Sequence, residues 1–406
     1  MKQIKGGVTA PLGYRATGGE AGIKNGIKDM ALLVSDVPAE AAGAFTTNVV
    51  KAASVTRNME IMEKKQKIKG IVINSGNANA CTGEDGVSAN EEMAQTLAKC
   101  LDVSGDAILT ASTGVIGVPF PIEKVKNGIF KLISKLGNTL EDGLLAAQGI
   151  MTTDTYSKEV AVEFTLGGKT VRMGGMAKGS GMIHPNMATM LGFITTDAAI
   201  DRGLLEKALK EDVKTTYNMV SVDGDTSTND TVIVLANGMA NNLMIQTENE
   251  DYETFCKALH FVNEVLAKQL VRDGEGATKF IEISVTGAAT EEDAKTIAKS
   301  VVTSSLVKTA MFGEDANWGR ILCAMGYSGI QFNPNMVDIV FESAAGSILL
   351  MEKGTPIVFD EEKAATILHE KEITVQITLQ EGNASAKAWG CDLSYEYVKI
   401  NGEYRS

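Results

Sequence analysis

The chain of 406 residues is 44% hydrophobic and 22% charged, a globular composition with room for two or three domains of roughly 150 residues each. Its formal charge of −13 and pI of about 4.9 argue against nucleic acid and anionic membranes as main partners. The N-terminal residues lack the apolar stretch of a signal peptide, and no run approaches the roughly 18–20 apolar residues that cross a bilayer, so we expect a cytoplasmic protein.

Cysteine and histidine usage agrees with that compartment. The five cysteines are scattered, odd in number and without CxxC spacing, which is typical of free thiols in a reducing cytoplasm. His184, His260 and His369 lie far apart in the sequence, so we do not expect a zinc site built from these residue types.

Local patterns predict a mixture of helices and strands. Strands are expected at 68–73, 160–166, 232–235, 280–285, 336–341, 373–379 and 395–400. Helices are expected after a capping box at Ser88 and Glu91, with Met93, Leu97 and Leu101 on one face, and after the caps Asp201 and Thr290. A further helix is expected after Asp251, with an apolar row at Phe255, Leu259, Val262, Leu266 and Leu270. Because these elements follow no regular βαβ period, we expect an α+β fold of layered sheets and helices.

The most unusual segment is residues 174–192, with the sequence GGMAKGSGMIHPNMATMLG. Its four early glycines permit close backbone approach and positive φ angles, and Lys178 lies among them. Ala188 and Thr189 follow, just before an apolar run at 191–194. By spacing alone, this pattern predicts a glycine-rich turn that leads into a buried strand. It is not a P-loop, since GxxxxGK[ST] is absent.

A threonine in this position also has a chemical interpretation. The hydroxyl of Thr189 can attack the carbonyl of Ala188 if the backbone is strained and the oxyanion is held, and hydrolysis of the resulting ester then cuts the chain. The new N-terminal threonine has both a hydroxyl nucleophile and an α-amine with a pKa of about 8, which can act as a general base at neutral pH. The ammonium of Lys178 would lower the pKa of that amine and bind anions.

Further motifs accompany this segment along the whole chain. They are AFTTN at 44–48, NSGNANACTG at 74–83, STGVIG at 112–117, MTTDT at 151–155, KGSGMI at 178–183, MATML at 187–191, DGDTSTND at 223–230, DGEGATK at 273–279, VKTA at 307–310, NWGR at 317–320 and NGEYRS at 401–406. In this order, they make the sequence similar to the ornithine acetyltransferase family of arginine biosynthesis.

The resemblance implies both a fold and an activity. It implies a self-processing enzyme with an N-terminal threonine nucleophile, cleaved between Ala188 and Thr189 into fragments 1–188 and 189–406. It also implies transfer of acetyl from N-acetylornithine to glutamate through an acetyl ester on Thr189. No cofactor is expected, because the enzyme itself stores the acetyl group. The sequence leaves open whether acetyl-CoA is a second donor.

The same resemblance implies roles for residues far from this segment. Thr113 and Gly114 would hold the oxyanion, and a hydroxyl and an amide suit that role, although 112–114 alone predicts an ordinary polar turn. Lys178 is the expected cation for the substrate carboxylate. Glu275, between two glycines, is the expected acid for the substrate ammonium, while Thr152 would hydrogen-bond the substrate.

Two details of the substrate site depend on other parts of the sequence. Thr153 fits the role of Thr152 equally well. The resemblance places Asn401 and the terminal hydroxyl residue Ser406 at the substrate site, reached across a subunit contact. Gly402 would let the chain turn after the expected strand and aim these groups back at the protein. We therefore expect a heterotetramer with two copies of each fragment.

The acidic run 223–230 lacks EF-hand spacing. This favours a turn whose side chains satisfy backbone groups over a metal-binding loop.

Two other classes of function fit the residues. A self-processed amidase or aminopeptidase would use the same nucleophile, but water would resolve its acyl-enzyme. A non-enzymatic amino-acid-binding protein would keep the chain intact. A denaturing gel separates the last case from the others, because a processed chain gives two bands.

Overall fold

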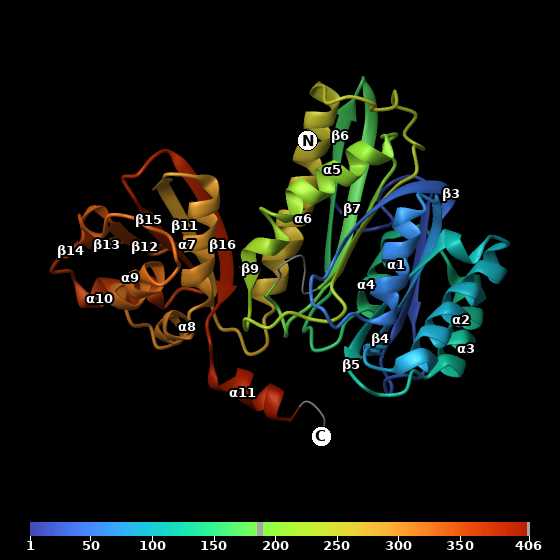
Figure 1. Ribbon diagram of the computed structural model, residues 1–406, viewed down its shortest axis with the longest axis horizontal. Helices are drawn as coiled ribbons and strands as arrows, with labels where there is room; N and C mark the ends of the chain where they lie inside the picture. Colours follow the sequence, from blue (N-terminus) through green and yellow to red (C-terminus); the bar gives the residue numbers. More distant parts are fainter. Residues whose placement is uncertain (185–189, 404–406) are drawn as a thin grey trace. The chain divides into compact units, whose positions relative to one another are not determined.

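The computed structural model describes residues 1–184 and 190–403, which form two compact units (Figure 1). The first unit contains Met1–Gly179, 190–218 and Thr226–Leu270. The second contains Ser180–His184, Met219–Asp225 and 271–403. Each of the expected fragments, 1–188 and 189–406, therefore contributes residues to both units.

Among the described residues, the first unit is built on a nine-stranded sheet with the order β1-β6-β7-β8-β10-β3-β4-β5, and β2 pairs with β3. The strands are β1 (Lys2–Ile4), β2 (Tyr14–Gly19), β3 (Met30–Phe45), β4 (Ile68–Asn77), β5 (Ile108–Val115), β6 (Lys158–Leu166), β7 (Lys169–Lys178), β8 (Leu191–Thr196) and β10 (Thr231–Ala236). β8 with β10 and β4 with β5 are parallel, and the remaining pairs are antiparallel. The apolar run at 191–194 is thus a strand, as predicted, and β8 is buried along its whole length.

Helices pack on this sheet and close its core. They are α1 (Ala53–Glu63), α2 (Gly83–Leu101), α3 (Ile122–Leu132), α4 (Leu140–Gly149), α5 (Arg202–Val213) and α6 (Glu250–Arg272), with short 3-10 turns at η1 (Gly105–Ala107), η2 (Ile133–Lys135) and η3 (Tyr217–Met219). The predicted cap of α5 is confirmed, because the Asp201 carboxylate accepts from the N–H groups of Gly203 and Leu204. The apolar row of α6 is confirmed as well, since Phe255, Leu259, Val262, Leu266 and Leu270 are fully buried.

The predicted start of α2 is wrong. Ser88 lies inside the helix, which begins five residues earlier at Gly83. Glu84 and Asp85 in the first turn favour that earlier start, because acidic side chains stabilise the positive end of the helix dipole. Of the predicted apolar face, Met93 and Leu97 are buried and Leu101 is partly buried.

Among the described residues, the second unit has a seven-stranded sheet with the order β14-β13-β12-β15-β11-β16-β9. The strands are β9 (Val220–Ser221), β11 (Phe280–Ala288), β12 (Asp338–Ser343), β13 (Gly346–Glu352), β14 (Thr355–Pro356), β15 (Glu372–Thr378) and β16 (Ala384–Cys391). The helices are α7 (Glu291–Thr303), α8 (Ser305–Phe312), α9 (Trp318–Gly326), α10 (Glu361–Leu368) and α11 (Tyr395–Gly402), and a 3-10 turn lies at η4 (Pro334–Met336). The Thr290 cap of α7 is confirmed, because its hydroxyl accepts from the Asp293 N–H.

The strand predicted at 395–400 is wrong, because these residues form helix α11. Alternation over six residues resembles a strand, yet residues four apart share one face of a helix. Tyr397 and Asn401 illustrate that face: both donate to carboxylates of the second unit, while Tyr395 and Val398 are exposed. Tertiary contacts therefore decide the conformation of this short segment.

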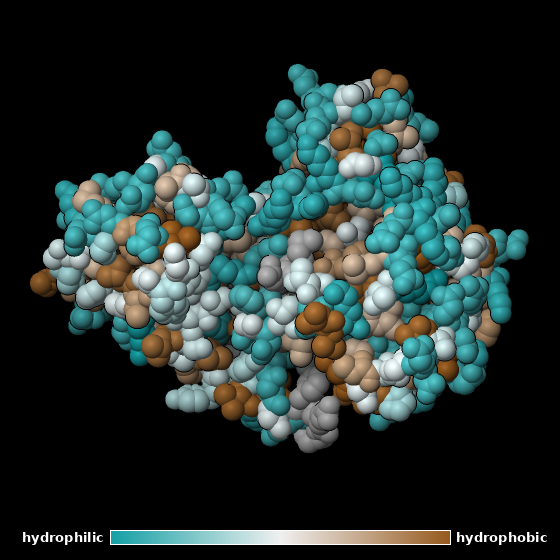
Figure 2. Space-filling view, in the orientation of Figure 1, coloured by the Kyte–Doolittle hydropathy of each residue, from teal (hydrophilic) through white to brown (hydrophobic). Residues whose placement is uncertain are grey.

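The α+β fold class is confirmed by the two mixed units. Figure 2 shows mainly hydrophilic residues on the visible face of the molecule, with apolar residues scattered among them. Among residues 1–184 and 190–403, every helix is too short or too polar to span a bilayer.

Candidate active site

Thr113 and Gly114 lie in the last part of strand β5, so the predicted polar turn is wrong. They pair with Ser75 and Gly76 of the parallel strand β4. Gly114 has a φ of +132°, and a Cβ there would lie 2.3 Å from the carbonyl carbon of Gly76. A glycine is required because β4 approaches the backbone at this point.

The structure joins two of the predicted site residues. Lys178 is the last residue of β7, and its side chain is buried. Its ammonium donates a hydrogen bond to the Thr113 hydroxyl at 3.2 Å, although the two residues are 65 positions apart. The predicted cation and the predicted oxyanion donor thus meet near the C-terminal ends of strands β7 and β5.

Asp154 is a site residue that the sequence reasoning missed. Its buried carboxylate accepts from the Lys158 ammonium at 2.8 Å, the Gly179 N–H at 2.7 Å and the Thr152 N–H at 2.9 Å. Burial raises the pKa of Asp154, but the charges of Lys178 and Lys158 outweigh it and hold the pKa at about 2. The carboxylate stays ionised and ties the loop of Thr152 to the end of β7.

A further lysine adds positive charge to this region. The half-buried Lys24 donates from its ammonium to the Met151 carbonyl at 2.7 Å. Burial lowers the pKa of Lys24, the carboxylate of Asp29 opposes this shift, and the charge of Lys178 adds to it. Several cations around Asp154 suit the binding of an anionic group. The sequence contains these lysines and Asp154, but it does not show that they lie close together.

The predicted acid lies in the second unit together with another predicted residue. Glu275 is buried, and its N–H donates to the Ser180 carbonyl at 2.8 Å. Asn401 of α11 donates from its side-chain amide to the Glu275 carboxylate at 2.8 Å. At Gly181, a Cβ would lie 2.3 Å from that carboxylate, which explains why glycine is needed there.

Three of the predicted residues lie outside the described part of the chain. They are Ala188 and Thr189 at the expected cleavage point and Ser406 at the C-terminus. The described residues nearest to Thr189 are His184 and Met190, which immediately precedes β8. The loop of Thr152 and Thr153 is described, and the contact of either threonine with the substrate remains a prediction.

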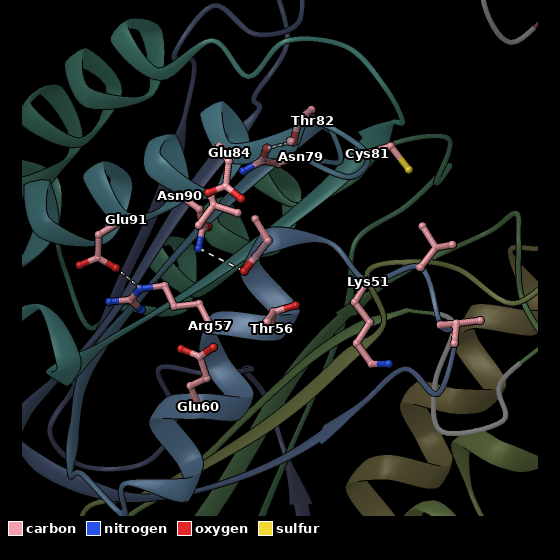
Figure 3. A pocket seen from close by; sticks show the side chains of 15 residues that line it. Lys51, Thr56, Arg57, Glu60, Asn79, Cys81, Thr82, Glu84, Asn90 and Glu91 are labelled. Atoms are coloured by element: carbon pink, nitrogen blue, oxygen red, sulfur yellow. Dashed lines mark hydrogen bonds and ion pairs between the residues drawn. The ribbon is translucent and has the colours of Figure 1, made fainter.

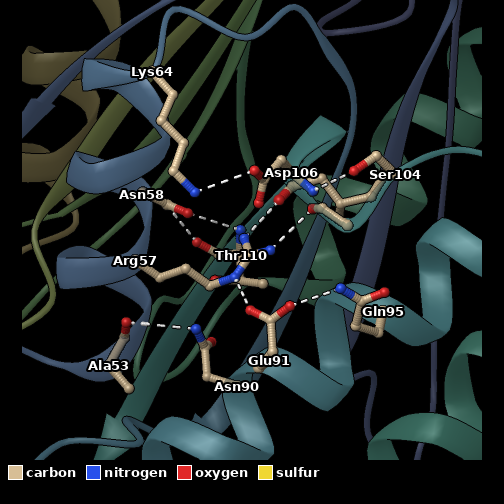
Figure 4. Close-up of polar contacts among 12 residues, drawn as sticks. Ala53, Arg57, Asn58, Lys64, Asn90, Glu91, Gln95, Ser104, Asp106 and Thr110 are labelled. Carbon is tan, nitrogen blue, oxygen red and sulfur yellow. Dashed lines mark hydrogen bonds and ion pairs between the residues drawn. The ribbon is translucent and has the colours of Figure 1, made fainter.

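A pocket of about 610 Å³ lies elsewhere, where α1 and α2 begin (Figure 3). None of the predicted site residues that the structure describes lines it. Arg57 occupies one side and donates to the carbonyls of Ile108 and Gly105 and to the Glu91 carboxylate (Figure 4). These bonds fasten α1 to the start of β5, so Arg57 has a structural role.

Comparisons with known proteins match the chain over nearly its full length. The model of the ArgJ family matches residues 15–406. The arginine biosynthesis bifunctional protein ArgJ of Caldanaerobacter subterraneus subsp. tengcongensis is 53% identical over 100% of both chains.

Two solved structures are also similar to this chain. A crystal structure of the arginine biosynthesis bifunctional protein ArgJ from Bacillus halodurans is 50% identical over 53% of this chain and 100% of its own, with a TM-score of 0.51. A structure of the ornithine acetyltransferase from Mycobacterium tuberculosis in complex with ornithine is 36% identical over 46% of this chain and 96% of its own, with a TM-score of 0.42.

Proposed function

The chain belongs to the ArgJ family of arginine biosynthesis acetyltransferases, and on this basis we propose that it cleaves itself before Thr189 and then carries acetyl on that threonine. The donor is N-acetylornithine and the acceptor is glutamate. Cleavage frees the α-amine of Thr189, and this amine takes the hydroxyl proton while the Thr189 oxygen attacks the acetyl carbonyl of N-acetylornithine. The amide C–N bond breaks, and ornithine leaves with that proton on its nitrogen. The amine of glutamate then attacks the acetyl ester, the ester C–O bond breaks, and the Thr189 oxygen takes back a proton, so no cofactor is needed.

The contact between Lys178 and Thr113 carries this proposal. A hydroxyl held by an ammonium, next to the Gly114 amide, provides oriented donors for a tetrahedral oxyanion. The Asp154 carboxylate holds the backbone next to Lys178, because it accepts hydrogen bonds from the N–H groups of Gly179 and Thr152. The surrounding lysines suit the carboxylate of an amino-acid substrate, and Glu275 is assigned to the ornithine ammonium.

The sheet of the first unit supports cleavage without dissociation. β8 and β10 come from the fragment after Thr189, and they pair with β7 and β3 of the other fragment. Separation would break two ladders in the middle of a buried sheet.

Several finer features belong to the same proposal. The assembly holds two copies of each fragment, 1–188 and 189–406, and Asn401 and Ser406 contribute to the substrate site. Acetyl-CoA is a second donor to test separately. The alternative hydrolase would release acetate when glutamate is absent, whereas a transferase holds the ester until an acceptor arrives.

The experiment that tests this function is steady-state kinetics at several concentrations of both substrates. We expect parallel double-reciprocal lines, because one site is loaded by the donor before it meets the acceptor. Without glutamate, mass spectrometry should find one acetyl group on the 218-residue fragment. Intersecting lines without an adduct would establish direct transfer in a ternary complex. Rapid release of acetate would establish the hydrolase.

Replacement of Glu275 by glutamine should weaken binding of N-acetylornithine. The substitution removes the charge but keeps an oxygen that can accept from the Asn401 amide. A charge-assisted contact contributes on the order of 1.5–3 kcal/mol, so we expect KM for N-acetylornithine to rise about tenfold or more. Cleavage should persist, since it involves no substrate.

A matched control for this variant is the exposed acid Glu292 in the first turn of α7. Glu292→Gln removes the same charge from the same unit and should leave both substrate KM values unchanged. An unaltered KM in Glu275→Gln would remove Glu275 from the substrate site.

A further inference from the structure

Residues 180–184 are the last described residues before the expected cleavage point, and most of them contact other segments of the second unit. The Ser180 carbonyl accepts from the Glu275 N–H at 2.8 Å, and the Ile183 carbonyl accepts from the Val222 N–H at 2.6 Å. The imidazole of His184 lies 3.2 Å from the Ser221 hydroxyl. The path of residues 180–184 is therefore set by contacts with segments that are distant in the sequence.

One carboxylate binds two successive N–H groups of this path. Asp223 accepts from Met182 at 2.6 Å and from Ile183 at 2.8 Å. Successive N–H groups can point at one anion where a residue in the right-handed helical conformation adjoins one in the left-handed conformation. Met182 has a left-handed φ of +55°. Because Met182 is not a glycine, this conformation is unfavourable by itself and depends on the carboxylate.

The same carboxylate is held by the C-terminal helix. The Tyr397 hydroxyl of α11 donates to Asp223 at 3.2 Å, and the Asp225 N–H donates to it at 3.2 Å. Burial, and after it the charge of Asp223, raise the pKa of Tyr397, so the phenol keeps its proton and remains a donor. Burial also raises the pKa of Asp223 above its usual range.

Helix α11 is itself anchored beside the other acid of this region. The Ser394 hydroxyl donates to the Gly276 carbonyl at 2.6 Å, and Asn401 donates to Glu275. At Gly276, a Cβ would lie 2.5 Å from the backbone nitrogen of Tyr397, so the helix approaches as closely as a glycine allows. α11 thus contacts both carboxylates that line residues 180–183.

We infer that Asp223 and Tyr397 are positioning residues for self-cleavage. They fix the backbone at Met182 and Ile183, and Ile183 is five residues before Ala188. An acyl shift within the chain needs the attacking hydroxyl and the carbonyl to be aligned, and a misplacement of about 1 Å can cost on the order of 10²-fold in rate. This inference rests on the proposed cleavage before Thr189 and adds a role for the C-terminal helix.

The test is a time course of cleavage after cell-free synthesis, read on a denaturing gel. Asp223→Asn should cleave at least tenfold more slowly, because it replaces one acceptor oxygen with a donor. Tyr397→Phe should slow cleavage about threefold, since the two backbone bonds to Asp223 remain. In the double variant, Tyr397→Phe should add nothing, because the hydroxyl acts only through the carboxylate.

The matched control is Tyr395→Phe, the same substitution at an exposed position of the same helix. It should cleave like the unmodified chain, because its ring can still pack edge-on against Phe312. The thermal midpoints of Tyr397→Phe and Tyr395→Phe should agree within experimental error.

Three outcomes would overturn the inference. They are cleavage at the normal rate in both Asp223→Asn and Tyr397→Phe, additive slowing in the double variant, and slowing of Tyr397→Phe with a matching fall in thermal midpoint. An unmodified chain that stays at 406 residues would instead refute the proposed function itself. The two failures are therefore distinguishable on the same gel.

Discussion

Thr189→Ala is expected to remain a single 406-residue chain and to lose acetyl transfer altogether. Without the hydroxyl there is no nucleophile for the Ala188 carbonyl, and without cleavage there is no free α-amine to act as the base. The unmodified protein should run as fragments of 188 and 218 residues on a denaturing gel. The fragments should elute together from a sizing column, because β8 and β10 lie between strands of the other fragment.

Thr189→Ser provides the control for this prediction. Serine keeps the hydroxyl and the α-amine after cleavage, so it should be processed, although its less restricted side chain should slow the step. If Thr189→Ala still yields fragments of 188 and 218 residues, another group is the processing nucleophile. If it is uncut but transfers acetyl at the normal rate, the acetyl-threonine scheme is wrong.

Thr113→Ala should lower kcat for acetyl transfer by about 10²–10³-fold. Loss of one oxyanion donor typically has an effect of this size, because the donor acts on charge that develops only in the transition state. The KM values should change little, since the ground-state carbonyl is a weaker acceptor. The substitution also removes the acceptor of the Lys178 hydrogen bond. The measurement is steady-state kinetics on fully cleaved protein.

Thr113→Ser is the matched control, because it keeps the hydroxyl within reach of Lys178. It should retain most of the activity, within about tenfold, if the hydroxyl is what matters. A similar loss in both variants would indicate that the Thr113 methyl group packs the site and that the oxyanion is held elsewhere. An unchanged kcat in Thr113→Ala would exclude the hydroxyl from the transition state.

The amino-acid sequence by itself determined the elements whose signals are local. The row of apolar residues from Phe255 to Leu270 predicted α6, and the capping side chains Asp201 and Thr290 marked the starts of α5 and α7. A capping side chain bonds to backbone groups only two or three residues away, so a short stretch of sequence is enough to predict where the helix begins. The order of the motifs also indicated the family, which the comparisons confirm.

Local signals were insufficient where the segment was short. Residues 395–400 alternate like a strand but form α11, and residues 112–114 look like a turn but belong to strand β5. Six residues contain fewer than two helical turns, so their periodicity does not separate the two conformations. What decided them were partners far away in the chain: Asp223 and Glu275 for α11, and β4 for β5.

The tertiary structure alone decided which polar residues meet. Sequence reasoning identified Lys178 and Thr113 separately, but it missed Asp154, Lys24, Asp223 and Tyr397 as parts of the same two regions. These residues are ordinary in their local context. They acquire roles because folding buries charged groups, and a buried charge is stable only where opposite charges or hydrogen-bond donors converge on it from several elements at once.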